Sequence, residues 1–271
     1  MRRVVTLGLM GLASLSGLVP ALSASAAPLA AHRAHYTLKL QETHGDVTAA
    51  TGTMDYQFED VCEGWATRQR LDMTLTNSDG QDIRMISDYA TLETKDGLHM
   101  QFHMRQTTDT AVTEQVDGDA TLSKPGGPGE VHYTAPEDKT IKLAPGTVFP
   151  TPHTETILAA AAAGKKFISL PLFDGTSERG PQDTFVTVLN WHGPSAAPFK
   201  PLDDLASGRF QLSFFDQTNQ GGSDQNGAGT PDYSVGMRYW ANGVSDALSM
   251  NFGDFIMQGV MDKFELLAHH C

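Results

Sequence analysis

The sequence predicts an all-β protein with one main helix, built as an antiparallel sheet that curls around its own contents. Apolar and polar residues alternate with a period of two over most of the chain, and turn-forming dipeptides separate the alternating segments. An alanine-rich segment is the one stretch with a sustained helical pattern. Short strands joined by hairpins favour either a closed barrel or a wrapped, open spiral.

The first half of the chain consists of such alternating segments. In residues 98–104 every second side chain is apolar, so four apolar side chains share one face. The dipeptide Asp79-Gly80 is a strong hairpin signal between two of the longest segments. The strands expected here cover residues 35–40, 53–58, 65–75, 83–92, 98–104, 111–116, 120–122, 131–134 and 139–143.

The helix is expected over residues 151–163, which end in five consecutive alanines. Thr151 can serve as the N-cap with Pro152 at the first helical position, and Gly164 suits the C-terminal end. Beyond the helix the pattern returns to strands, with a weaker short helix over residues 202–206 and a polar, glycine-rich loop at 217–230. The later strands cover residues 167–173, 184–191, 209–215, 232–241 and 247–267.

The N-terminus has the features of a secretory signal. Arg2 and Arg3 precede an apolar run over residues 4–19, and small residues follow in an A-x-A exit. We expect residues 1–26 to be removed and residues 27–271 to form a single β-spiral domain; the alternative is an uncleaved membrane anchor. No later segment approaches membrane-spanning length, so the processed protein should be soluble in the periplasm.

The formal net charge is −13. This balance argues against nucleic acid as a partner, and against binding to an anionic lipid surface by charge alone.

The chain has two cysteines, Cys62 and Cys271. In an exported chain an even cysteine count favours a structural disulfide, and two buried free thiols are the alternative. A loop this long would stabilise the protein by about 5 kcal/mol at most. His269 and His270 beside Cys271 could bind a metal only if that thiol were free.

No catalytic constellation is visible in the sequence. The G-x-S-x-G, H-E-x-x-H and phosphate-loop motifs are absent. His99 and His103 would lie about 13 Å apart on one strand face, too far for one metal ion. His32 and His35, at the start of the first strand, are most simply solvated. The acidic clusters are interpreted as solvated faces; they are Asp55, Glu59 and Asp60, and Asp79, Asp82 and Asp88. We therefore assign no catalytic, cofactor-binding or metal-binding residue.

The remaining informative feature of the sequence is its content of aromatic residues and methionine. Trp65, Trp191 and Trp240, together with 13 Phe and 11 Met, are spread over the expected strands. Methionine fills irregular gaps and adapts to apolar ligands. An ordinary hydrophobic core explains this composition, and a hydrophobic groove under the helix is the functional alternative.

Several segments, in this order, resemble the cell envelope integrity protein B (EipB) family of exported proteins. They are residues 31–38 (AHRAHYTL), 52–56 (GTMDY), 60–65 (DVCEGW), 96–102 (DGLHMQF), 150–153 (PTPH) and 156–161 (TILAAA), with a cysteine at the C-terminus. The resemblance implies an unclosed, spiral-like β-barrel around a helix, similar to periplasmic lipoprotein carriers. It also implies a disulfide between Cys62 and Cys271, a role in maintaining the cell envelope under stress, and no enzymatic activity.

The sequence thus indicates a non-enzymatic periplasmic protein that supports envelope integrity. It would bind a hydrophobic moiety, such as a lipid or lipoprotein acyl chain, or dock an envelope partner on its curved sheet. A periplasmic tetratricopeptide-repeat protein is the partner that the resemblance suggests. The alternative is an envelope hydrolase that acts on glycan or peptide through an Asp, Glu or His site.

Overall fold

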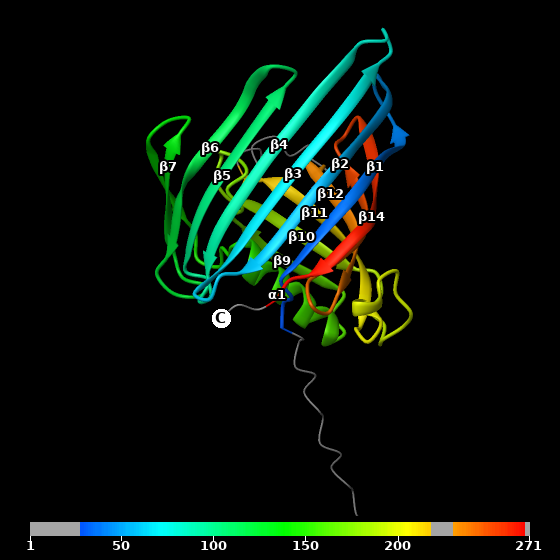
Figure 1. The fold of residues 1–271 in the computed structure, drawn as a ribbon. Helices are drawn as coiled ribbons and strands as arrows, with labels where there is room; N and C mark the ends of the chain where they lie inside the picture. Colours follow the sequence, from blue (N-terminus) through cyan, green and yellow to red (C-terminus); the bar gives the residue numbers. More distant parts are fainter. Residues whose placement is uncertain (1–27, 218–229, 269–271) are drawn as a thin grey trace, which may run out of the picture.

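The computed structural model describes residues 28–217 and 230–268, and within them fourteen strands form one antiparallel sheet (Figure 1). The first eight strands are β1 His32–Thr43, β2 Val47–Asp60, β3 Gly64–Asn77, β4 Asp82–Thr94, β5 His99–Thr108, β6 Ala111–Leu122, β7 Gly129–Ala135 and β8 Lys139–Leu143. The helix α1 Pro150–Ala162 follows. The remaining elements are β9 Phe167–Leu172, β10 Gln182–Val188, the 3₁₀ turn η1 Lys200–Leu202, β11 Ser207–Asp216, β12 Tyr233–Trp240, β13 Ser245–Asn251 and β14 Phe255–Leu266.

The sheet is wrapped but not closed. Its strand order is β8-β7-β6-β5-β4-β3-β2-β1-β14-β13-β12-β11-β10-β9, so β8 and β9 are its two edges. The first and last strands of the chain pair along their length, from His32 opposite Leu266 to Thr43 opposite Phe255. Figure 1 shows β1 beside β14, with β2–β6 in front and β9–β12 behind them. The predicted all-β, unclosed spiral with one helix is confirmed.

The alternating sequence pattern sets which side chains face the interior. In β5, Met100, Phe102 and Met104 are buried, while His99 and His103 point outward. These three apolar side chains belong to a core cluster with β6, β7 and the aromatic rings of Phe149 and Phe173. A second cluster lies on the inner face of β1, β2 and β3 and of β12, β13 and β14.

The helix α1 spans residues 150–162 against the predicted 151–163, and its N-cap lies two residues before the predicted Thr151. Phe149 is the N-cap and Pro150 the first helical residue, because the Thr151 side chain is bonded to another element and does not cap the helix. At the other end Gly164 has φ +76°, the left-handed conformation that glycine adopts most easily after a helix. Ile157 and Ala161 of α1 pack on the inner face of β10 and β11, so the helix lies inside the curved sheet.

Two expectations for the second half were wrong. The long strand predicted over residues 247–267 is two strands, β13 and β14, because Gly253 (φ +88°) reverses the chain. Asn251 Oδ1 accepts a hydrogen bond from the Gly253 amide and fixes this turn. The short helix is the 3₁₀ turn η1, which ends at the start of the predicted segment 202–206. Most of the loop predicted at 217–230 lies outside the described residues.

Candidate functional site

The curved sheet and the first turn of α1 line an open cavity of about 480 Å³. This volume lies within the range of ordinary ligand pockets. The cavity wall is mainly apolar and aromatic, and it draws on both halves of the sheet. Its apolar lining includes Met54, Phe58, Met104, Leu172, Leu212, Phe214, Val235, Met237, Leu248 and Met250.

Five tyrosines also line this cavity: Tyr36, Tyr56, Tyr89, Tyr233 and Tyr239. Burial raises the pKa of each hydroxyl above its usual value, so all five remain neutral in the physiological range. The hydroxyl of Tyr36 donates to the Ser245 carbonyl at 2.7 Å, and that of Tyr89 to the Asp174 carbonyl at 2.6 Å. Because these two protons are used within the protein, their rings present mostly apolar surface to a ligand.

His153 of α1 faces the cavity and is held by β10. Its Nε2 lies 2.9 Å from Thr184 Oγ1, and the Thr184 hydroxyl donates to the Leu170 carbonyl at 2.7 Å. The oxygen of Thr184 must therefore accept a hydrogen bond from the Nε2–H group, which makes His153 the donor of that bond. Burial lowers the pKa of His153 to about 4. This threonine and histidine are not a nucleophile and its base, because the hydroxyl proton points away from the imidazole.

Glu93, at the end of β4, is fully buried beside the cavity. Its two carboxylate oxygens accept hydrogen bonds from the backbone amide and the hydroxyl of Thr151 in the first turn of α1. Burial is the main cause that raises the pKa of Glu93 to about 7, and the two bonds from Thr151 oppose it. The carboxylate anchors the helix rather than facing a ligand, since both of its oxygens are used.

Two more acids line the cavity, and neither pairs with His153. Burial raises the pKa of Asp174, whose carboxylate accepts from the amide and hydroxyl of Thr176. Burial also raises the pKa of Glu114. Among residues 28–217 and 230–268, no group of three His, Cys, Asp or Glu side chains is placed to hold a metal ion.

His32 is a correction to the expectation of a solvated residue. It is 2 % exposed, and its ring packs against Tyr56, Phe58 and Phe264. The even-numbered residues 32–38 of β1 point inward, so His32 shares the inner face with Tyr36 and Leu38. Burial lowers the pKa of His32. His35 faces outward, where its Nδ1 lies 2.6 Å from Asp55 Oδ1.

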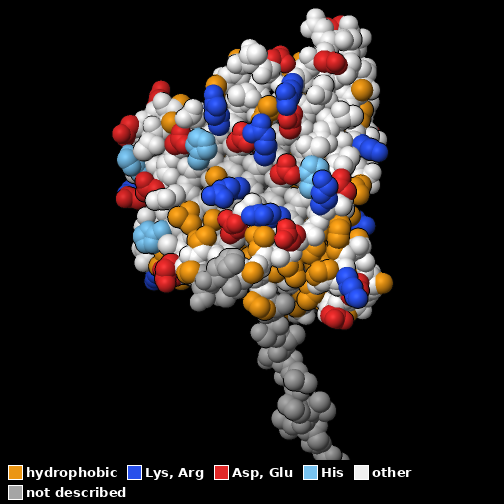
Figure 2. Space-filling view, viewed as in Figure 1, with side chains coloured by type: hydrophobic (Ala, Val, Ile, Leu, Met, Phe, Trp, Pro, Cys, Tyr) orange, Lys and Arg blue, Asp and Glu red, His pale blue; other side chains and the backbone are white. Residues whose placement is uncertain are grey.

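The acidic clusters lie on the outer face, where they make ion pairs and capping bonds. Figure 2 shows acidic and basic side chains interspersed over the outer face of β2–β5. Glu59 lies near Arg68 at 3.5 Å, and Asp60 pairs with Lys95 at 2.9 Å. Asp79 caps the β3–β4 turn by accepting from the Gln81 amide.

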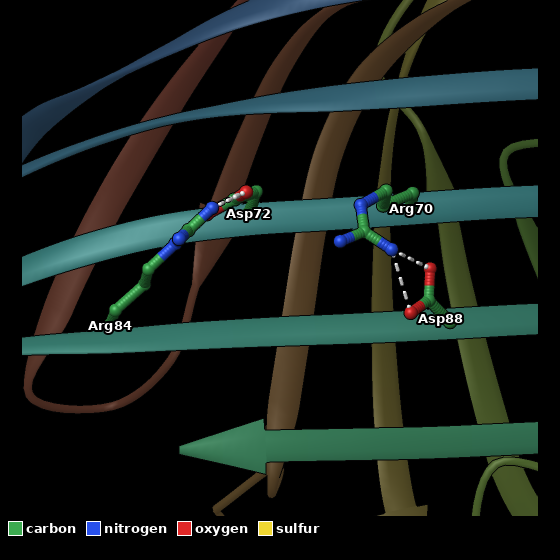
Figure 3. Close-up of polar contacts among 4 residues, drawn as sticks. All are labelled: Arg70, Asp72, Arg84 and Asp88. Carbon is green, nitrogen blue, oxygen red and sulfur yellow. Dashed lines mark hydrogen bonds and ion pairs between the residues drawn. The ribbon is translucent and has the colours of Figure 1, made fainter. Parts of the chain in front are cut away.

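Cross-strand pairs between β3 and β4 are drawn in Figure 3. Arg70 Nη1 reaches both oxygens of Asp88 at 2.7 and 2.8 Å. Arg84 binds Asp72 through Nε and Nη2 at 2.9 and 2.6 Å. These acids therefore serve the outer surface and are not directed into the cavity.

His99 and His103 also lie on the outer face of β5, and each has a partner on β6. His103 Nδ1 pairs with Asp117, and His99 Nδ1 lies 3.3 Å from Thr121 Oγ1. Cys62 is in the turn between β2 and β3 with φ 71°. Cys271, His269 and His270 lie outside the described residues, so the Cys62–Cys271 bridge stays a prediction.

The sequence reasoning missed Glu93, His153 and the tyrosines of the cavity. The alternation along β4 could have predicted that Glu93 is buried. Glu93 is two residues from Thr91 and four from Tyr89, so it shares the inner face of the strand with them. An acid in an inward position is buried and must find donors. The sequence could not show that the first turn of α1 supplies them.

The helices in the described part of the chain are too short or too polar to cross a bilayer. The EipB-like family model matches residues 23–268. The cell envelope integrity protein EipB of Brucella abortus (strain 2308) is 31% identical over 259 residues, which cover 91% of this chain and 87% of that protein. A crystal structure from Brucella abortus, described as a beta-barrel-like protein of a domain of unknown function, matches with a TM-score of 0.79 and 27% identity. The match covers 89% of this chain and 99% of that one.

The family match spans most of the chain, and the wrapped sheet agrees with the solved relative. The chain belongs to the EipB-like family.

Proposed function

We propose that this protein supports the integrity of the cell envelope from the periplasm, without catalysis, by holding a hydrophobic moiety such as an acyl chain inside its curved sheet. The Brucella relative carries the name of an envelope integrity protein. The leader-like N-terminus supports export. The single observation that carries the binding role is the cavity of about 480 Å³, walled by apolar and aromatic side chains.

The physical basis of binding would be removal of apolar surface from water. Each Å² of such surface contributes about 25 cal/mol, so an alkyl chain along this wall gains affinity from length rather than from polar contacts. The polar groups at the wall support this assignment. Tyr36, Tyr89 and His153 each donate a hydrogen bond to an acceptor within the protein, so these donors are not offered to a ligand.

The first experiment is mass spectrometry of lipids extracted from the protein purified from its own envelope. A retained acyl lipid supports the proposal. Recovery of a bound protein instead, such as the tetratricopeptide-repeat partner expected from the family, would favour docking on the sheet and count against an acyl-binding role.

The second experiment measures binding of parinaric acid, a fluorescent fatty acid. Ser87 lines the cavity from the inner face of β4, so Ser87→Phe should fill part of it and raise the Kd about tenfold or more. The matched control is Thr74→Phe on the outer face of β3, which should bind like the wild type. Equal binding by all three proteins would place the fatty acid outside the cavity and overturn the proposal.

A further inference from the structure

Three large apolar side chains are exposed on the outer face of β9, of β10 and of the residue that follows β10. Phe167 is 65 % exposed, Phe185 43 % and Leu189 59 %. The rings of Phe167 and Phe185 stack with centroids 5.9 Å apart. β9 is the edge of the sheet, so these rings sit at the margin of the molecule. Together with Lys165, Lys166 and Arg209 they form what we call the edge patch.

The three cations of the edge patch have no acidic partner among the residues that the structure describes. Lys165 and Lys166 are exposed and immediately precede Phe167, and the Arg209 carbonyl accepts from the Leu189 amide at 2.9 Å. Within residues 28–217 and 230–268, no acid lies within 4.0 Å of any of the three charged groups.

The acids nearest to the edge patch along its own strands are already used. Arg209 is opposite another arginine, Arg238, whose guanidinium holds Asp246. Asp183, two residues from Phe185 on the same face of β10, accepts a hydrogen bond from Gln217 at 2.9 Å. The edge patch is therefore locally cationic although the chain carries a net charge of −13.

The outer face of the first half of the sheet is organised differently. There basic side chains lie among acidic ones over β2–β5, and Arg70 and Arg84 each bind an aspartate (Figures 2 and 3). Surface cations that are already paired have little left to offer an anionic partner. In the part of the chain that the structure describes, the exposed phenylalanine, tyrosine or tryptophan rings are those of Phe167 and Phe185, and the unpaired cations of the edge patch lie around them.

The strand that carries Phe185 is packed against the helix on its other face. On the opposite face of β10, Val186 and Val188 are buried against Ile157 and Ala161 of α1. The two stacked rings are thus presented by a strand that is fixed on its inner side. Hiding them from water by a local shift of β10 would expose this packed layer.

We propose that the edge patch docks the protein on the surface of a lipid bilayer that contains anionic lipids. Aromatic and leucine side chains favour the headgroup boundary, and each Lys or Arg near an anionic surface adds attraction that salt weakens. The edge patch offers both features side by side. A second copy of the chain fits it poorly, because a two-fold contact would bring like charges together.

The test is co-flotation with vesicles of phosphatidylcholine alone or with added phosphatidylglycerol. The protein is taken in its exported form with the N-terminus checked by mass, because an uncleaved apolar leader would itself bind lipid. Binding should require the anionic lipid and fall with salt. The variants Phe167→Ser with Phe185→Ser, and Lys165→Glu with Lys166→Glu, should each lower the vesicle partition coefficient about tenfold.

Matched variants separate the edge patch from general effects. Val112→Ser with Val260→Ser removes exposed apolar side chains elsewhere, and Lys39→Glu with Lys263→Glu makes the same change in net charge on β1 and β14. Both should float like the wild type. A Phe167→Trp variant gives a direct readout, since its fluorescence should be quenched by brominated lipid. Absence of flotation, or equal loss in the control variants, would overturn the proposal, as would self-association through the edge patch.

Discussion

Glu93 and Thr151 are joined twice. Oε2 of Glu93 accepts from the Thr151 amide at 3.0 Å, and Oε1 accepts from the Thr151 hydroxyl at 2.9 Å. The pair ties the end of β4 to the first turn of α1, where the helix has unsatisfied amide donors. It therefore fixes the first turn of the helix, which lines the cavity, from a strand far away in sequence.

This carboxylate should give the protein a distinctive dependence on pH. Because its pKa is raised from near 4.5 to about 7, the folded state binds the proton more tightly than the unfolded state. The contribution of Glu93 to the free energy of unfolding should thus fall, by about 3 kcal/mol, as the pH rises from about 4.5 to about 7. In Glu93→Gln this component should vanish. Denaturant melts of both proteins across this range measure it as a difference.

Glu265→Gln, at an exposed position of β14, is the control for that comparison. It should follow the wild-type curve. If Glu93→Gln also follows the wild type over this range, the buried carboxylate does not titrate as inferred.

His153 should act in the opposite sense. Its pKa is lowered from 6.5 to about 4, so the folded state resists protonation. Its contribution to the free energy of unfolding is fully present above pH 6.5 and should be lost as the pH falls from 6.5 towards 4. In NMR titrations its ring proton should stay at the neutral shift down to about pH 5. An inflection near pH 6.5 that is absent in His153→Gln would contradict this prediction.

Two arginine–aspartate pairs, in each of which both carboxylate oxygens accept, should differ in energetic weight. Asp246 is almost fully buried, with 4 % of its side chain exposed, whereas Asp88 is 47 % exposed. Arg238→Met removes the partner of a buried charge and should lower the free energy of unfolding by about 3 to 5 kcal/mol. Arg70→Met breaks an exposed pair and should cost less than about 1 kcal/mol. Chemical denaturation measures both, and equal costs would refute the distinction.

The Cys62–Cys271 disulfide remains to be tested. If it forms, thiol titration of the denatured, unreduced protein should find no reactive thiol, and Cys62→Ser should lower the Tm measured without reductant. Dithiothreitol should lower the wild-type Tm and leave the variant unchanged. Two titratable thiols in the wild type would show that the bridge is absent.

The sequence was sufficient where the physics is local. The alternation in β5 placed Met100, Phe102 and Met104 on the inner face because successive side chains of a strand point to opposite sides. The alanine run predicted α1, and Gly164 marked its end, because both effects act within a few residues. The same alternation places His32 on the inner face of β1, with Tyr36 and Leu38. The prediction of a solvated His32 was wrong because it did not follow this alternation.

Only the tertiary structure decided which distant segments meet. The pairing of β1 with β14 and the reach of Glu93 to Thr151 depend on long-range closure of the chain, to which no short segment is sensitive. The same closure separates the cavity from the edge patch, since it decides that Val186 faces α1 while Phe185 faces solvent. The alternation in the sequence predicted which residues share a face of a strand. The wrapping of the sheet determined whether that face contacts the helix, the cavity or solvent.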